Sequence, residues 1–253
     1  NMTRAERIFK NFGDQQVLKG IDFTFEAGKT NLVIGKSGSG KTVLLKILVG
    51  LFKPTSGNVW YSDTNLVNAD KNALRQLRMQ VGMLFQGNAL FDSMTIEENI
   101  RFPLDMFTNK TLKEKTDRVN YCLERVSLSG NNKKFPSEIS GGMQKRVGIA
   151  RAIVLNPKYL FCDEPNSGLD PQTSITIDDL IQDITKEFKM TTVVNTHDMN
   201  SVMEIGENIC LIDKGLLAWA GSKDQVLADD NETLHDFIFA SPFLQKLVES
   251  IKK

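Results

Sequence analysis

Residues 35–42 read Gly-Lys-Ser-Gly-Ser-Gly-Lys-Thr, and this stretch decides the fold of the chain. It follows the apolar run 31–34, which suits a buried strand, and it precedes residues 43–51, where apolar side chains recur at helical spacing. The pattern GxxxxGK[ST] between a strand and a helix is typical of a loop that wraps phosphate groups. Its glycines let the backbone curl so that successive N–H groups point at phosphate oxygens.

Two residues at the end of this loop have polar side chains suited to bind a nucleotide and its metal ion. Lys41 is placed to meet the β and γ phosphates of a nucleotide, and Thr42 to offer its hydroxyl to Mg²⁺. A flexible Gly/Ser turn, the alternative interpretation, would not require Lys-Thr or the flanking strand and helix. We therefore predict a nucleotide-binding loop that consists of Gly35, Ser37, Gly38, Ser39, Gly40, Lys41 and Thr42.

A second group of polar residues follows two other apolar runs. Asp163 and Glu164 end the run 159–162, and His197 follows the run 191–194. At such a sheet edge Asp163 would hold Mg²⁺, Glu164 would polarise a water for attack on the γ phosphate, and His197 would contact that phosphate. An acidic pair after a strand is usually a solvated turn, and a lone His is more often structural. Together with the glycine loop, however, they indicate a P-loop NTPase.

Composition limits the class of protein. The chain has 253 residues, 41% of them hydrophobic, and its 31 basic and 31 acidic side chains balance, which excludes disordered, collagen-like and disulfide-scaffold proteins. Zero net charge argues against a global field that would hold nucleic acid or an anionic membrane. The three cysteines contain no CxxC pair, which favours a reduced, intracellular compartment. The most apolar stretch, 43–52, is too short to span a membrane, so we expect a soluble protein.

The remaining pattern predicts alternating strands and helices. We expect strands at 21–25 and 59–61, a mostly helical region at 95–154, a helix at 175–188, a hairpin of 210–212 with 217–219, and a helical tail from Lys223. Thr95 and Glu98 form a capping-box pattern at the start of the helical region.

Residues 139–146, Ile-Ser-Gly-Gly-Met-Gln-Lys-Arg, resemble the signature of ATP-binding cassette (ABC) ATPases, usually written LSGGQ. Ser140 can cap a helix with a buried stripe of Met143, Val147, Ala150 and Val154, which leaves free N–H groups facing outward. Because the chain already has one phosphate-binding loop, this second anion site suggests a nucleotide shared between two copies. An ordinary capped helix remains the alternative for this segment taken alone.

The resemblance extends over nearly the whole chain and implies further roles. Phe12 matches the aromatic that stacks on adenine, although it could equally be core, and Gln86 matches the Q-loop glutamine that touches Mg²⁺ and the attacking water. Residues 167–170, Ser-Gly-Leu-Asp, match the D-loop at the dimer interface. The implied site has catalytic Glu164, His197 and Gln86, Mg²⁺ ligands Thr42, Gln86 and Asp163, signature residues Ser140, Gly141 and Gly142 on the opposite protomer, and D-loop residues Ser167 and Asp170.

The resemblance also implies the fold and its division. We expect an α/β fold of the P-loop NTPase class, an ABC-type ATPase with a mixed core sheet, an N-terminal antiparallel β region and a helical subdomain. Residues 2–253 would form one ATPase domain: a nucleotide-binding core at 2–94 and 155–222, a helical subdomain with the signature at 95–154, and a C-terminal helical tail at 223–253.

Two departures from the usual ABC pattern narrow the resemblance. Met143 stands where most members have Gln, and residues 82–91 read Gly-Met-Leu-Phe-Gln-Gly-Asn-Ala-Leu-Phe. Both features are similar to the ATPases of the Mla and Mce lipid-trafficking transporters. That similarity implies that the chain forms a homodimer or pairs with another ABC ATPase subunit. The pair would hydrolyse ATP with Mg²⁺ on the cytoplasmic face of the inner membrane. It would thereby drive an integral-membrane permease for phospholipid or a related lipid.

In this interpretation the surface near Gln86, Phe91 and Met94 accepts a short permease helix, although these apolar residues could also be core. Neither the transported substrate nor nucleic acid would touch the chain. If Met143 is a neutral exchange, the chain could serve another importer or exporter. A non-transport ABC ATPase acting on nucleic acid or ribosomes generally has a coiled-coil insert or two cassettes, and neither is visible. A small-molecule P-loop kinase has no use for the signature or the D-loop.

Overall fold

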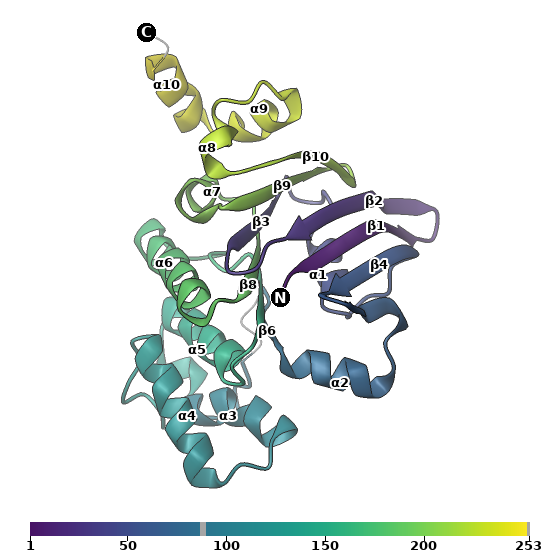
Figure 1. The fold of residues 1–253 in the computed structure, drawn as a ribbon. Coiled ribbons are helices and arrows are strands. Elements are labelled where there is room, and N and C mark those ends of the chain that lie inside the picture. The colour runs from purple at the N-terminus through teal and green to yellow at the C-terminus, as the bar shows by residue number, and fades with distance from the viewer. Residues whose placement is uncertain (87–89, 252–253) are drawn as a thin grey trace.

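A computed structural model describes residues 1–86 and 90–251 of the chain and places two β-sheets at its centre (Figure 1). The N-terminal sheet is antiparallel and has the strand order β2 (Gln15–Phe25), β1 (Thr3–Phe12), β4 (Ser56–Tyr61), β5 (Thr64–Asn65). The core sheet has the order β10 (Leu216–Gly221), β9 (Asn208–Asp213), β3 (Thr30–Ile34), β8 (Thr191–Thr196), β7 (Tyr159–Asp163), β6 (Val81–Leu84). Its strands are parallel except for β10, which pairs antiparallel with β9. The predicted α/β fold with a mixed core sheet is confirmed.

Helices cover the core sheet and extend from it in two directions. They are α1 (Lys41–Leu48), α2 (Lys71–Met79), α3 (Ile96–Phe107), α4 (Leu112–Arg125), α5 (Gly141–Ile153), α6 (Pro171–Phe188), α7 (Met199–Ile205), α8 (Lys223–Val226), α9 (Glu232–Ile238) and α10 (Pro242–Ile251). Short 3₁₀ turns occupy Leu66–Asn68 and Pro136–Glu138. Helices α3, α4 and α5 gather at one end of the molecule, and α8, α9 and α10 lie at the other (Figure 1).

The core sheet is buried on both faces, which explains its continuous apolar strands. All five residues of β3 are buried, and its three apolar side chains alternate between two hydrophobic clusters. Leu32 and Ile34 pack with residues of α5 and α6, while Val33 packs with residues of α1 and the N-terminal sheet. Burying a Val, Leu or Ile side chain contributes about 1.5–3 kcal/mol, so the two clusters hold the sheet between its helices. This arrangement fixes the carboxyl ends of β3, β7 and β8 beside one another.

Local signals place the start of α3 where the sequence predicts it, whereas α6, capped by Asp170, begins at Pro171, four residues before the predicted start at 175. Thr95 accepts a hydrogen bond from the Glu98 N–H, and the Glu98 side chain accepts one from the Thr95 N–H, which completes the predicted capping box of α3. The predicted strands at 21–25 and 59–61, the hairpin of β9 and β10, and the helical tail are also present.

The sequence interpretation gave no residue range for strands β1, β5 and β6 or for helices α2 and α7. Of α2, only Leu77 is buried, and its other positions are mostly charged or polar, so the apolar stripe is thin. Strand β6 has only four residues, and α7 only seven. Such short elements are stabilised by the sheet and helices around them rather than by their own pattern. Within the described residues, no helix is both long enough and apolar enough to cross a membrane.

Candidate nucleotide-binding site

A cavity of about 1280 Å³ opens at the carboxyl ends of the core strands. It collects predicted site residues from segments far apart in the sequence, which fits the rule that ligands of open α/β sheets bind at this edge. The predicted residues that line it are Ser37, Gly38, Gly40, Lys41, Thr42, Gln86, Glu164, Ser167 and His197. The far wall comes from α9 and the start of α10, through Phe237 and Leu244.

The loop between β3 and α1 requires glycine at two positions for steric reasons. A Cβ on Gly35 would lie 2.3 Å from the carbonyl oxygen of Ile212. Gly40 has a φ of +106°, and a Cβ there would lie 2.8 Å from Cδ2 of Leu18. Both contacts are shorter than side chains tolerate, so the backbone can approach the sheet only without a Cβ. Ser39 lies between them and is buried.

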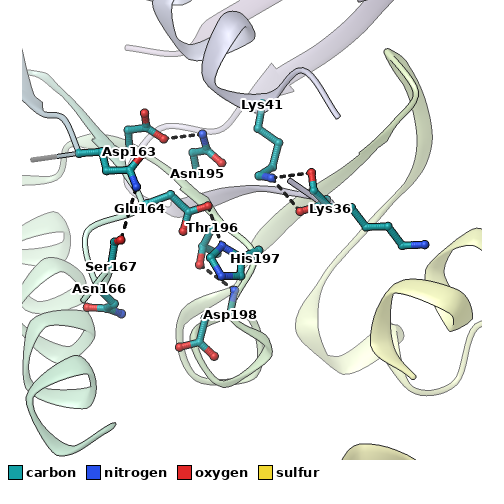
Figure 2. A network of polar contacts seen from close by, with 12 residues as sticks. Lys36, Lys41, Asp163, Glu164, Asn166, Ser167, Asn195, Thr196, His197 and Asp198 are labelled. Carbon is teal, nitrogen blue, oxygen red and sulfur yellow. Dashed lines mark hydrogen bonds and ion pairs between the residues drawn. The ribbon is translucent and has the colours of Figure 1, made fainter. Parts of the chain in front are cut away.

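Lys41 is a buried cation at the start of α1. Its Nζ donates hydrogen bonds to the carbonyl oxygens of Gly35, at 2.7 Å, and Lys36, at 3.0 Å (Figure 2). Burial lowers the pKa of Lys41, and the charges of Glu164 and Asp163 oppose that shift. The ammonium group therefore lies at the centre of the loop, where an anionic ligand would compensate its lost hydration.

Thr42 and Asp163 meet beside Lys41. The Thr42 hydroxyl lies 3.4 Å from Oδ1 of Asp163. Asn195 Nδ2 donates to the same Oδ1 at 2.6 Å (Figure 2). Asp163 is only 2% exposed, and burial, with the nearby charge of Glu164, raises its pKa. Hydroxyl and carboxylate oxygens are the hard donors that Mg²⁺ prefers, and the buried Oδ1 of Asn195 has no partner among the described residues. The donor set therefore fits Mg²⁺.

Asn195 is a site residue that sequence reasoning missed. It is completely buried on β8 and pairs in register with Asp163 on β7. The signal was a single amide side chain in the otherwise apolar or hydroxyl-bearing run Thr191–Thr196. Asn195 reaches Asp163 only because β8 lies beside β7, and the sequence pattern does not show which strands are neighbours.

Glu164 and His197 face each other across the cavity (Figure 2). The His197 Nδ1 lies 2.9 Å from Glu164 Oε1, and the side chains are 65% and 14% exposed, respectively. Glu164 has a left-handed φ of +48°, which is uncommon for a residue with a side chain. Such backbone strain often occurs at functional sites, where the surrounding structure holds it in place.

The Q-loop and D-loop residues also approach each other. Gln86 Nε2 lies 3.4 Å from the Ser167 hydroxyl oxygen. Asp170 instead caps α6, because its Oδ1 accepts from the Thr173 N–H at 3.0 Å and its Oδ2 accepts from the Thr173 hydroxyl at 2.6 Å. Residues 87–89, part of the run that resembles the Mla and Mce ATPases, lie outside the described residues.

The signature residues lie away from the loop that holds Lys41. Ser140 caps α5, since its hydroxyl oxygen accepts from the Met143 N–H at 3.2 Å. Of the predicted stripe, Val147, Ala150 and Val154 are buried and Met143 is partly buried. Ser140, Gly141 and Gly142 are absent from the described residues that line the cavity. The signature residues of this chain therefore do not line its own cavity.

Phe12 and Phe91 are exposed, so the alternative that places them in the core is wrong. Phe12 is 45% exposed and packs edge-to-face on Phe52, with ring centroids 5.8 Å apart, and the Lys10 ammonium lies 4.9 Å from the Phe12 centroid. Phe91 is 40% exposed beside Phe102, and Met94 is partly exposed.

Comparisons with known proteins agree with this geometry. A family model described as ABC transporter matches residues 18–167. The probable ribonucleotide transport ATP-binding protein mkl of Mycobacterium bovis is 38% identical over 231 residues, which cover 91% of this chain and 64% of mkl. The methionine import ATP-binding protein MetN of Bacillus subtilis is 35% identical over 250 residues, covering 98% and 72% of the two chains.

Two solved structures have the same fold. The cbiO1 protein of Clostridium perfringens, part of the ABC transporter complex cbiONQ, gives a TM-score of 0.83 at 28% identity and covers 98% of both chains. A dimeric ATP-binding cassette, MJ0796, bound to ADP and Pi gives a TM-score of 0.79 at 30% identity, and the match covers 87% of this chain and 98% of that one.

Proposed function

Because this chain belongs to the ABC transporter family, we propose that it is an ATP-hydrolysing subunit that works as a pair of nucleotide-binding chains. One observation carries this proposal. The cavity joins Lys41, Thr42, Glu164 and His197, whereas the signature residues that would complete an ATP site are not among the described residues that line it. A second copy, turned head to tail, would bring its Ser140 to the nucleotide held by Lys41.

Each residue of the cavity has a defined task in the proposed reaction. Lys41 and the N–H groups of the loop bind the phosphates, and the N-terminus of α1 adds partial positive charge. Thr42, Gln86 and Asp163 would hold Mg²⁺, which neutralises charge that develops on the phosphates. Glu164 orients and deprotonates the attacking water, and His197 contacts the γ phosphate. Phe12, at the end of β1, would stack on adenine, and Ser167 and Asp170 would contact the partner copy.

We further propose that the signature residues couple ATP hydrolysis to the opening of the closed pair. Ser140, Gly141 and Gly142 of one copy contact the γ phosphate bound to the other, so its release removes the interaction that favours the closed pair. Residues 95–154 would move with the signature as a helical subdomain against the core of residues 2–94 and 155–222, while residues 223–253 form the tail.

The partner of the pair would be an integral-membrane permease, and the transported substrate a phospholipid or a related lipid. The exposed apolar side chain of Phe91, near Gln86 and Met94, supports docking of a permease helix at the cytoplasmic face of the membrane. Met143 and residues 82–91 support the lipid class. The names of mkl and MetN instead refer to ribonucleotide and methionine transport, so these substrates are the competing candidates.

Two measurements test the proposal. The purified chain should hydrolyse ATP without an added acceptor, EDTA should stop the reaction, and the rate per molecule should fall on dilution because the active form is a pair. Reconstituted with its co-purified permease, the complex should then respond to phospholipid rather than to methionine or ribonucleotides. A rate per molecule that is independent of dilution would contradict the shared site, and stimulation by methionine or ribonucleotide alone would contradict the lipid.

A further inference from the structure

A buried carboxylate on α6 joins the two backbone segments that carry Glu164 and His197. Asp178 Oδ1 accepts a hydrogen bond from Asn166 Nδ2 at 2.7 Å, and its Oδ2 accepts one from the Ser201 hydroxyl at 2.7 Å. Asn166 Nδ2 also lies 3.2 Å from the Ser201 oxygen, which closes a triangle of three side chains. Asp178 and Ser201 are 3% and 1% exposed.

Asn166 and Ser201, the two hydrogen-bond partners of Asp178, both lie beside the proposed reaction centre. Asn166 lies two residues after Glu164 and directly before Ser167, and it lines the cavity (Figure 2). The turn that contains it is closed by bonds from the Ser167 N–H to the Glu164 carbonyl and from the Leu169 N–H to the Asn166 carbonyl, at 3.1 and 3.2 Å. Ser201 lies in the first turn of α7, whose N-cap, Asp198, follows His197.

Stability alone does not explain a carboxylate at this position. Among the described residues no cationic side chain pairs with Asp178, and burial, with the negative charges of Asp198 and Asp179, works against its ionised form. Replacing a buried polar network as a whole by apolar residues of similar volume is often neutral or stabilising, so fold stability does not require Asp178, Asn166 and Ser201 together. What Asp178 supplies is two acceptor oxygens in fixed directions. They also determine the orientation of the Asn166 amide, since the buried Oδ1 of Asn166 has no partner among the described residues.

We propose that Asp178 is a positioning residue that sets the placement of Glu164, Ser167 and His197 for ATP hydrolysis. Asp178 is not among the described residues that line the cavity, and it acts through Asn166 on one segment and through Ser201 on the other. Because a reaction centre loses rate steeply when its groups shift by a fraction of an ångström, Asp178 controls the turnover number and not the affinity for ATP. The inference rests on the proposed ATPase activity.

The test compares three variants with a matched control. Asp178→Leu removes both acceptors and should lower kcat about tenfold, with the Kd for ATP changed less than about twofold. Its free energy of unfolding should fall, because the Asn166 amide and the Ser201 hydroxyl lose their acceptors, so kcat is measured under conditions in which the variant is folded. Asp178→Asn should keep kcat within about threefold, since its amide can still bond Asn166 while the Ser201 hydroxyl turns to accept. Asp179→Asn is the control, because Asp179 is the exposed neighbour, and its kcat should change less than about twofold.

Ser201→Ala keeps the test decisive if the leucine variant does not fold. It removes only the hydroxyl that joins α7 to Asp178 and leaves the bond from Asn166 to Asp178 in place. It should lower kcat about fivefold at unchanged ATP affinity. A folded Asp178→Leu or Ser201→Ala protein with wild-type kcat would overturn the inference, and so would a loss of kcat that only parallels a loss of stability. A wild-type chain without ATPase activity would instead contradict the proposed function itself.

Discussion

The Nδ1 atom of His197 lies 2.9 Å from Oε1 of Glu164, so the two residues that follow β8 and β7 share a hydrogen bond across the cavity. If the neutral ring donates from Nδ1, its Nε2 carries no proton and cannot donate to a phosphate oxygen. Binding of a γ phosphate at Nε2 therefore requires either a protonated ring or loss of the bond to Glu164. The hydrogen bond to Glu164, the proposed base, therefore affects whether His197 can donate a hydrogen bond to the γ phosphate.

Replacement of Glu164 by Gln should separate binding from hydrolysis. The amide cannot accept a proton from water, so hydrolysis should fall at least about 100-fold, while the phosphate loop stays intact and ATP affinity changes less than about threefold. Size-exclusion chromatography with saturating Mg-ATP should then show a stable dimer. Glu204→Gln, on the exposed side of α7, is the control. Monomers that persist in the Glu164→Gln protein would contradict the shared-site mechanism.

Removal of the Lys41 ammonium should weaken nucleotide binding itself. In Lys41→Ala the bonds to Gly35 and Lys36 disappear together with the charge that compensates the phosphates, so affinity for ATP should fall by about 10–100-fold. Lys113→Ala removes the same charge from an exposed position of α4, outside the cavity lining, and should leave affinity within about threefold. Isothermal titration with a non-hydrolysable ATP analogue measures both. Equal affinity of the Lys41→Ala and wild-type chains would place the phosphates elsewhere.

Phe12 should contribute to nucleotide binding without contributing much to stability. Its ring is 45% exposed, so Phe12→Ala should lower ATP affinity about tenfold through lost stacking on the base, and the unfolding temperature should change little. Phe12→Tyr keeps the aromatic face and should bind ATP as the wild type does. If Phe12→Ala binds as tightly as Phe12→Tyr, adenine does not stack at this position.

The two signature glycines should respond differently to an added methyl group. The nearest atom to a Cβ on Gly141 is Leu169 Cδ2 at 3.8 Å, whereas a Cβ on Gly142 would lie 2.6 Å from Thr173 Cγ2. Gly141→Ala should therefore fold normally and, in the Glu164→Gln background, weaken ATP-dependent dimerisation at least about fivefold, because the methyl obstructs the partner's phosphate. Gly142→Ala should lower the free energy of unfolding by about 1–3 kcal/mol. Thermal unfolding of the monomers and equilibrium sedimentation distinguish the two effects. Normal dimerisation of Gly141→Ala would exclude this surface from the interface.

Asp178 should make stability depend on pH in a direction opposite to that of most acidic residues. Burial raises its pKa to about 6 from an ordinary value of 3.8, and the hydrogen bonds from Ser201 and Asn166 only partly offset this. The unfolded chain then releases the proton at lower pH than the native chain, so the native state loses stability as pH rises from about 4 to 6, after which this contribution is constant. Urea unfolding at a series of pH values should show the wild type losing stability relative to Asp178→Asn across that range. Parallel curves would mean that Asp178 keeps an ordinary pKa when folded.

Much of the architecture was predictable because it depends on local pattern. The loop between β3 and α1, the cap of α3 by Thr95, and the acids at the end of β7 each follow from the order of residue types over about ten positions. Short elements such as α2 and β6 carry too few apolar positions for that signal, and they form because neighbouring elements bury them.

By itself, then, the sequence determined which residues could bind phosphate and roughly where most of the strands and helices lie. Only the tertiary structure decided which polar groups meet. Asn195 reaches Asp163 because β8 lies beside β7, and Asp178 reaches Ser201 because α6 packs on α7. These pairings join residues 32 and 23 positions apart, and the chain pattern contains no signal for them, since a polar side chain selects its partner by distance in space. The same holds for Ser140, which caps α5 but is not among the described residues that line the cavity with Lys41, since the packing of α5 decides its position.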